Sequence, residues 1–100
     1  MVLYNVTAKI NKDAEQEWLD FMNNNHIPAV MATGHFTGYR LCHLLDVPED
    51  DGATYVIQYE APTLHKLNHY QVHDAPALRE EYDAKFKGRV VMFRTVMEVI

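Results

Sequence analysis

His26 is the side chain of this sequence best suited to acid–base chemistry. It follows three consecutive asparagines and stands two residues before Pro28, so it lies where a helix is expected to break. A break frees backbone groups and lets an imidazole point into a cleft, and an ordinary imidazole suits general acid or base work near neutral pH. The alternative is that the ring caps the broken helix by bonding a freed carbonyl.

Tyrosines gather on one predicted face of the sheet. Tyr4, Tyr39, Tyr55 and Tyr59 share the helix-facing parity with His43. A buried hydroxyl without a partner costs about 1–3 kcal/mol, so these groups must bond one another, water or a ligand. Mutual hydrogen bonding with a few waters is one solution. A small-molecule cleft is the other, and its candidate residues are Tyr4, Trp18, Met22, His26, Tyr39, His43 and Tyr59.

Three histidines, His65, His69 and His73, recur every four residues on one side of a predicted helix. Imidazoles at this spacing can share a zinc or nickel ion, but only Asp74 stands nearby to complete the ligand set. We therefore expect a solvated helix face and no metal site. The sequence has no phosphate loop, dinucleotide fingerprint or serine elbow, so we expect no cofactor. Cys42 is expected to be a buried thiol without catalytic use.

The elements that position these residues follow a β-α-β-β-α-β order. Alternation predicts strands over residues 2–10, 53–61 and 89–99, and several β-favouring side chains predict another over 36–45. Helical spacing predicts a kinked helix from residue 13 to about 32, and a second broken one over 63–86. The expected fold is α+β and ferredoxin-like, a four-stranded antiparallel sheet with both helices on one face. In the strand over 36–45, hydrophobicity does not decide which parity faces inward.

The opposite face of this sheet has nothing in the chain to cover it. On the predicted parities it mixes apolar with polar side chains, among them Leu3, Val56, Val90, Met92, Val96, Thr7 and Glu98. We expect a second copy of the sheet to cover it, through a dimer face of Asn5, Arg40, Gln58, Glu60, Met92 and Arg94. The two arginines would pair with carboxylates across that interface, or else hold an acidic ligand. A monomer with a solvated face is the alternative.

Composition limits the possible functions. The 100 residues, with 48% hydrophobic and 23% charged, predict a single domain over 1–100. A net charge of −5 disfavours nucleic acid and anionic membrane surfaces as partners. No apolar run reaches the roughly 18 residues of a membrane span. A lone cysteine and a start without secretion-signal features favour a cytoplasmic location.

Several short sequence motifs along the whole chain indicate a family resemblance: Tyr4-Asn5-Val6-Thr7, Glu17-Trp18-Leu19, His26-Ile27-Pro28, Ala32-Thr33-Gly34, Thr54-Tyr55, Gln58-Tyr59, Ala75-Pro76-Ala77-Leu78 and Phe93-Arg94. With them the sequence resembles short bacterial proteins that form a domain-of-unknown-function family within the dimeric α+β barrels. This resemblance implies a homodimer and a cleft between helices and sheet. The wider superfamily includes small monooxygenases, haem-degrading enzymes, cyclases and stress-induced proteins. The sequence departs from the pattern at Asp74, where an aromatic or imidazole side chain is expected.

Two functional hypotheses result. The first is a cytoplasmic homodimeric module that binds a small, mostly apolar or aromatic molecule without transforming it. The second is a cofactor-independent oxygenase, isomerase or cyclase acting on an aromatic or polyketide-like substrate. In that case His26 acts as acid or base and a tyrosine holds the developing oxyanion.

Overall fold

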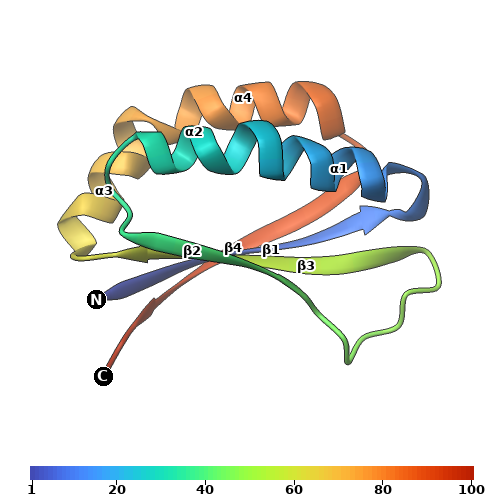
Figure 1. The fold of residues 1–100 in the computed structure, drawn as a ribbon, viewed down its shortest axis with the longest axis horizontal. Coiled ribbons are helices and arrows are strands. Elements are labelled where there is room, and N and C mark those ends of the chain that lie inside the picture. Colours follow the sequence, from blue (N-terminus) through green and yellow to red (C-terminus); the bar gives the residue numbers. More distant parts are fainter.

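The protein forms one four-stranded antiparallel sheet with all helices on one face (Figure 1). The computed structural model describes residues 1–100. Its elements, in chain order, are β1 (Val2–Asn11), a 3-10 turn (Lys12–Ala14), α1 (Glu15–Phe21), the π-helical segment η2 (Met22–His26), α2 (Ile27–Ala32), β2 (Gly38–His43), β3 (Gly52–Ala61), α3 (Leu64–His73), α4 (Ala75–Phe86) and β4 (Val90–Glu98). The strand order β2-β3-β1-β4 confirms the expected ferredoxin-like fold.

The core lies between the helices and the upper face of the sheet. The register pairs Tyr4 with Tyr59 and Ala8 with Tyr55 across β1 and β3, so these side chains share the helix-facing side. Trp18 of α1 and Phe86 of α4 close over them, and both are essentially inaccessible to solvent. The alternation predicted for these two central strands is therefore confirmed, because the helix-facing side of each strand is buried, with Val6 of β1 partly buried as the one exception.

The first helical segment differs from its prediction. Instead of breaking before Pro28, the helix runs on through five residues of π-helix, Met22–His26, into α2 (Figure 1). The N–H of Ile27 donates to the carbonyl of Met22, five residues earlier, which is the wider π spacing. Pro28 has no N–H to donate and its ring would crowd a normal turn, so a widened turn accommodates it without a break. The expected kink is thus replaced by a local widening.

The second helical segment has the expected break. Thr63 caps α3 by accepting a hydrogen bond from the backbone N–H of Lys66, and α3 ends at His73. Pro76 stands in the first turn of α4, where its missing N–H costs nothing. The chain then turns at Gly88, whose φ of 84° is readily adopted only by glycine.

The two edge strands account for the errors in predicted side-chain direction. In β4 the register sets Arg94 opposite Val6 and Met92 opposite Ala8, so both lie on the helix-facing side. We expected both on the opposite face of the sheet, which no helix covers and which is called the bare face below, and this prediction is wrong. The same prediction is wrong for Val90, Val96 and Glu98. Both parities of β4 are apolar, so the pattern could not discriminate between them. Cys42 was expected to be buried, but it is exposed on edge strand β2.

Candidate functional site

A cavity opens between the helical layer and the β1–β4 half of the sheet. It encloses ≈ 420 Å³ together with its opening to solvent, but the enclosed interior is only ≈ 20 Å³, enough for about one water molecule. Strands β1, β3 and β4 supply its floor, while α1, η2, α3 and α4 supply its walls. Its lining residues are Tyr4, Val6, Trp18, Met22, His26, Ile57, Tyr59, Tyr70, Arg79, Tyr82, Met92 and Arg94.

His26, at the end of the π-helical segment, lines this cavity beside Tyr82. The two rings meet edge to face at 5.5 Å between centroids, and the ring of Phe21 lies 6.0 Å from His26 and 6.3 Å from Tyr82, so the three rings form one cluster. No hydrogen bond joins the imidazole to a backbone carbonyl, so the capping role considered for it is absent. π-Helical turns often occur at functional sites, and this one aims His26 at the cavity.

Burial and charge keep His26 neutral. Desolvation of the ring, reinforced by the positive charge of Arg94, lowers the pKa of His26 to about 4. At pH 7 the imidazole is therefore uncharged, and it presents one N–H donor and one nitrogen lone pair. It is able to accept a proton or a hydrogen bond from a bound molecule.

Tyr82 is held in place by Trp18. The indole Nε1–H of Trp18 donates to the hydroxyl oxygen of Tyr82 at 2.7 Å, and both side chains are buried. Because that oxygen accepts from Trp18, the hydroxyl hydrogen of Tyr82 stays available to donate into the cavity. Burial raises the pKa of Tyr82 to about 12, so it remains a donor at neutral pH.

Two arginines give the cavity a positive character. Arg79 of α4 donates to the hydroxyl of Tyr4 at 3.2 Å and to the side-chain oxygen of Gln71. Arg94 of β4 donates only to the sulfur of Met92, at 3.3 Å. Neither guanidinium pairs with a carboxylate, and no Asp or Glu lines the cavity. The site therefore combines aromatic walls with unpaired positive charge, which suits a ligand bearing one anionic group.

The tyrosine hydroxyls find their partners in helix side chains and not in one another. Tyr4 bonds Arg79 and Tyr82 bonds Trp18, while Tyr55 donates to Oε2 of Glu15 at 2.6 Å. Tyr59 and Tyr70 line the cavity; burial raises the pKa of Tyr70 to about 12 and that of Tyr59 further. This tyrosine-rich side of the sheet is thus partly a bonded core and partly a cavity wall.

The structure brings together five of the predicted cleft residues, Tyr4, Trp18, Met22, His26 and Tyr59. It leaves out Tyr39, half exposed at the β2 edge, and His43, whose ring stacks on Tyr55 at 4.7 Å and contacts Glu49 at 2.5 Å. A ligand in this cavity stays a prediction.

Sequence reasoning missed Tyr70, Arg79 and Tyr82, and it assigned Met92 and Arg94 to the other face. The one available signal was the spacing of Arg79 and Tyr82, three residues apart and therefore on the same side of α4.

The histidine stripe of α3, for which we expected a solvated helix face and no metal site, belongs only in part to a side-chain cluster. His69 lies close to His73, with ring centroids 4.3 Å apart, but the side chains that come together as possible ligands are His35, His69 and Asp74. Desolvation and the nearby imidazoles of His73 and His35 lower the pKa of His69. His35 was not considered from the sequence, because it lies in the distant α2–β2 connection.

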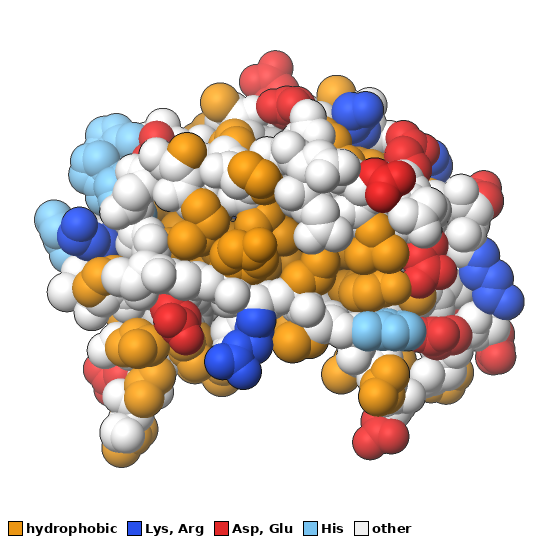
Figure 2. Space-filling view, viewed as in Figure 1, with side chains coloured by type: hydrophobic (Ala, Val, Ile, Leu, Met, Phe, Trp, Pro, Cys, Tyr) orange, Lys and Arg blue, Asp and Glu red, His pale blue; other side chains and the backbone are white.

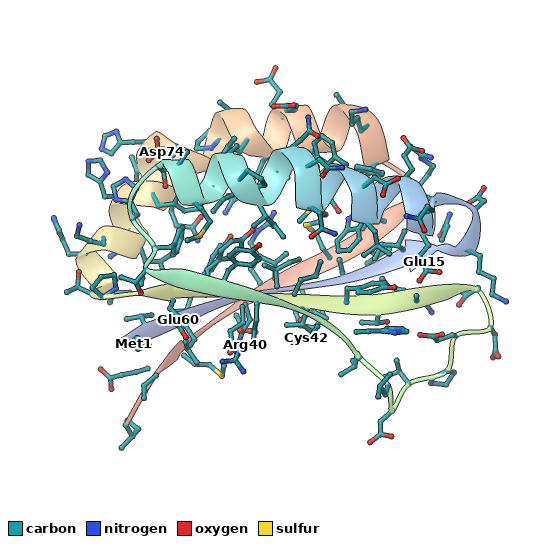
Figure 3. The ribbon with its side chains drawn as sticks, in the orientation of Figure 1. Met1, Glu15, Arg40, Cys42, Glu60 and Asp74 are labelled. Carbon is teal, nitrogen blue, oxygen red and sulfur yellow. The ribbon has the colours of Figure 1, made fainter.

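The bare face of the sheet is hollowed and carries exposed apolar side chains beside polar ones. Figure 2 shows a concave underside between two projections, and in Figure 3 Arg40, Cys42 and Glu60 point below the sheet. Val91 and Phe93 of β4 are 75% and 60% exposed there, beside a hollow of ≈ 430 Å³ whose walls are Thr7, Lys9, Leu44, Val47, Thr54, Val91 and Phe93. On the same face of the sheet, Asn5 of β1 is buried, and its Oδ1 is the one buried side-chain oxygen or nitrogen without a hydrogen-bond partner.

No helix in the structure is long and apolar enough to cross a membrane.

The fold is shared with solved structures of low sequence identity. A protein described as a putative antibiotic biosynthesis monooxygenase from Deinococcus radiodurans aligns with a TM-score of 0.71 at 16% identity, covering 100% of this chain and 93% of that one. A dimeric ferredoxin-like protein from an uncultured marine organism gives 0.71 at 10%, covering 99% and 94%. SnoaB, a cofactor-independent oxygenase from Streptomyces nogalater, gives 0.65 at 9%, covering 98% and 92%. These likenesses establish the fold, and fold alone does not choose a function.

No curated protein matches the sequence. A family profile does match, over residues 1–100, and its description is a domain of unknown function, DUF4286. The predicted resemblance to such a family is thereby confirmed, and this chain belongs to the DUF4286 family.

Proposed function

We propose that the protein binds a small aromatic or largely apolar molecule that carries one acidic group. The observation that supports this most directly is the pair of arginines, Arg79 and Arg94, which line an otherwise aromatic cavity without a carboxylate partner. Arg79 is half-buried and Arg94 is exposed, and an anion bound between them and the aromatic walls would form charge-assisted hydrogen bonds with both guanidiniums. The tyrosine rings supply flat apolar contact area, and Tyr82 supplies a hydroxyl donor.

The ligand enters by moving flexible side chains. The enclosed space is ≈ 20 Å³, whereas small-molecule pockets typically hold about 300–1,000 Å³. Met22, Met92 and Arg94 line the cavity and have long unbranched side chains that change rotamer at low cost. Moving them outward enlarges the enclosed part of the ≈ 420 Å³ that the cavity and its opening occupy together.

The test compares charged and neutral probes on matched variants. Aromatic carboxylates and the corresponding neutral amides are titrated by calorimetry into the wild type, Arg94→Gln and Lys87→Gln. Loss of a charge-assisted hydrogen bond should weaken carboxylate binding to Arg94→Gln by about 10- to 100-fold and leave amide binding unchanged. Lys87→Gln removes the same charge from an exposed position and should match the wild type. Equal carboxylate affinities for all three proteins would contradict the proposal.

We also propose that the bare face joins two copies of the chain into a homodimer. Its exposed Val91 and Phe93 form an apolar patch, and the unpartnered Oδ1 of Asn5 needs a donor. A second sheet would cover the apolar patch and supply the donor, and one similar structure is described as dimeric. The exposed thiol of Cys42 is compatible with the reducing cytoplasm, which we propose as the location.

Sedimentation equilibrium tests the dimer. Phe93→Glu places a charge in the proposed interface and should weaken association at least about 100-fold. Leu64→Glu, an equivalent change at an exposed site on α3, is the control and should leave association unchanged. An identical association constant for Phe93→Glu and the wild type would place any interface elsewhere.

A second candidate function is catalysis by proton abstraction. His26 is a neutral base at the cavity, and Arg94 and the hydroxyl of Tyr82 lie where they could stabilise an enolate or phenolate. Removal of a proton from an acidic carbon or phenol starts isomerisation, cyclisation and cofactor-independent oxygenation alike. A base with a pKa of about 4 gives little driving force for that transfer at pH 7, which is why binding is the first proposal. If the chain is an enzyme, His26→Gln should abolish solvent-deuterium exchange into a bound substrate while ligand affinity persists.

A further inference from the structure

We propose that His35, His69 and Asp74 form a binding site for a divalent transition metal, with Zn²⁺ the best fit. These residues come from three places in the chain: the α2–β2 connection, the middle of α3, and the junction of α3 with α4. Figure 2 shows histidines gathered at the α3 end of the helical layer, and Figure 3 shows Asp74 at the same end. The site is separate from the cavity, and the proposal does not depend on what the cavity binds.

The ligand atoms already have the spacing that a tetrahedral ion requires. Nε2 of His35 lies 3.0 Å from Oδ2 of Asp74 and 3.3 Å from Nδ1 of His69, and the three atoms all lie within 4.8 Å of one another. With bonds of about 2.0–2.1 Å and tetrahedral angles, the ligands of Zn²⁺ stand about 3.3 Å apart. The separations of His35 from Asp74 and from His69 therefore need almost no change. A rotation of the exposed His69 ring brings its Nδ1 closer to the Asp74 carboxylate.

The hydrogen-bonding pattern without a cation is unsatisfactory. Nε2 of His35 faces both a carboxylate oxygen and a ring nitrogen, yet a neutral imidazole has at most one hydrogen on that atom. Either that hydrogen is shared between two acceptors, or lone pairs face one another. A cation at the centre is attracted by all three lone pairs at once. An ion would replace the shared hydrogen by three metal–ligand bonds.

The donor set selects the class of metal. Two imidazole nitrogens and one carboxylate oxygen are typical of Zn²⁺ and less suitable for Mg²⁺ or Ca²⁺, which prefer oxygen ligands only. The side chains of His35 and Asp74 are 17% and 35% exposed, so the site is sheltered but open on one side. The fourth position falls to water or to His73, whose ring is 4.3 Å from that of His69.

A bound ion would tie the α2–β2 connection to the α3–α4 junction. Phe36, the residue after His35, packs against the rings of Tyr4, Tyr59 and Tyr70 at 6.2, 5.1 and 4.9 Å between centroids. Fixing His35 therefore also fixes one end of this aromatic cluster. The expected role of the ion is structural.

The experiment uses the full chain without a histidine tag, stripped with a chelator. Zn²⁺ is titrated in competition with a chromophoric chelator, and Co²⁺ is added as a spectroscopic probe. We expect one Zn²⁺ per chain, a higher melting temperature with Zn²⁺, and the intense visible absorption of tetrahedral Co²⁺. Loss of even an outer-shell partner costs about 10- to 100-fold in metal affinity, so His35→Ala and Asp74→Asn should each weaken Zn²⁺ binding at least tenfold.

His65→Ala is the matched control, because His65 belongs to the helix stripe but not to the cluster. It should bind Zn²⁺ as the wild type does. If His65→Ala loses Zn²⁺ while His35→Ala and Asp74→Asn retain it, the ion sits on the α3 face and the proposal is wrong. Melting curves in chelator check that the variants are folded. If a variant fails to fold, the wild type decides alone: weak six-coordinate Co²⁺ absorption or no melting shift with Zn²⁺ overturns the site.

Discussion

Acidification should destabilise the protein through His26. An unfolded imidazole binds its proton near pH 6.5, whereas burial and Arg94 lower the pKa of the folded His26 to about 4. Between these two pH values the proton binds preferentially to the unfolded chain, so stability falls as the pH falls. The difference between these two pKa values corresponds to at most about 3.4 kcal/mol of stability. This stability is lost progressively as the pH falls from about 6.5 to 4, and none of it is lost above pH 7. Partial exposure of the ring lowers the expected loss to about 1–3 kcal/mol.

Replacing His26 with glutamine removes the titrating group and keeps a polar side chain. The free energy of unfolding is measured by urea denaturation at several pH values between 4.5 and 7.5 (about the window of the shift) and at one protein concentration, since the proposed dimer would also contribute to stability. The difference between wild type and His26→Gln should change by about 1–3 kcal/mol across that window. His65→Gln, at an exposed position, should show no such change. A pH-independent difference for His26→Gln would mean that the imidazole is solvated and does not face the cavity.

Three further substitutions test local features of the structure. Tyr82→Phe leaves the buried indole N–H of Trp18 without its acceptor and should cost about 1–3 kcal/mol in urea denaturation, toward the lower value if a water enters the cavity. Thr63→Ala removes the side-chain cap of α3 and should cost about 1 kcal/mol, measured in the same way; no loss would exclude the cap. Gly52→Ala brings a Cβ within 2.3 Å of the carbonyl oxygen of Ile10, so we expect more than about 2 kcal/mol of destabilisation and a lower melting temperature.

The central strands were predictable because their environment is asymmetric. In β1 and β3 the helix-facing residues are buried or, for Val6, partly buried, so hydrophobic alternation identifies the strand and the inward face together. The helix boundaries at Thr63 and Gly88 were equally clear, since a cap and a positive φ depend on a few local residue types. These features need no knowledge of distant contacts.

The candidate site was only partly predictable, because it depends on relations between distant segments. Arg94 was assigned to the wrong face since both parities of β4 are apolar, and only its register against β1 decides the direction. A π-helical turn aims His26 at the cavity, but the residue pattern there predicts a helix break equally well, so the sequence could not distinguish the two. His35 meets Asp74 across 39 positions of sequence, a contact that follows from the fold and not from any spacing.

The register of β4 also connects the two proposed surfaces. Met92 and Arg94 line the cavity, while Phe93 between them lies on the bare face, so one edge strand serves both. An edge strand is held by hydrogen bonds to a single neighbour, here β1, and gains order when something packs against its exposed side. A second copy seated on Phe93 would therefore also restrict the backbone that carries Arg94. Ligand affinity should accordingly be lower in the dimer-weakened Phe93→Glu than in Leu64→Glu, although neither residue touches the cavity, and equal affinities would show that the two faces act independently.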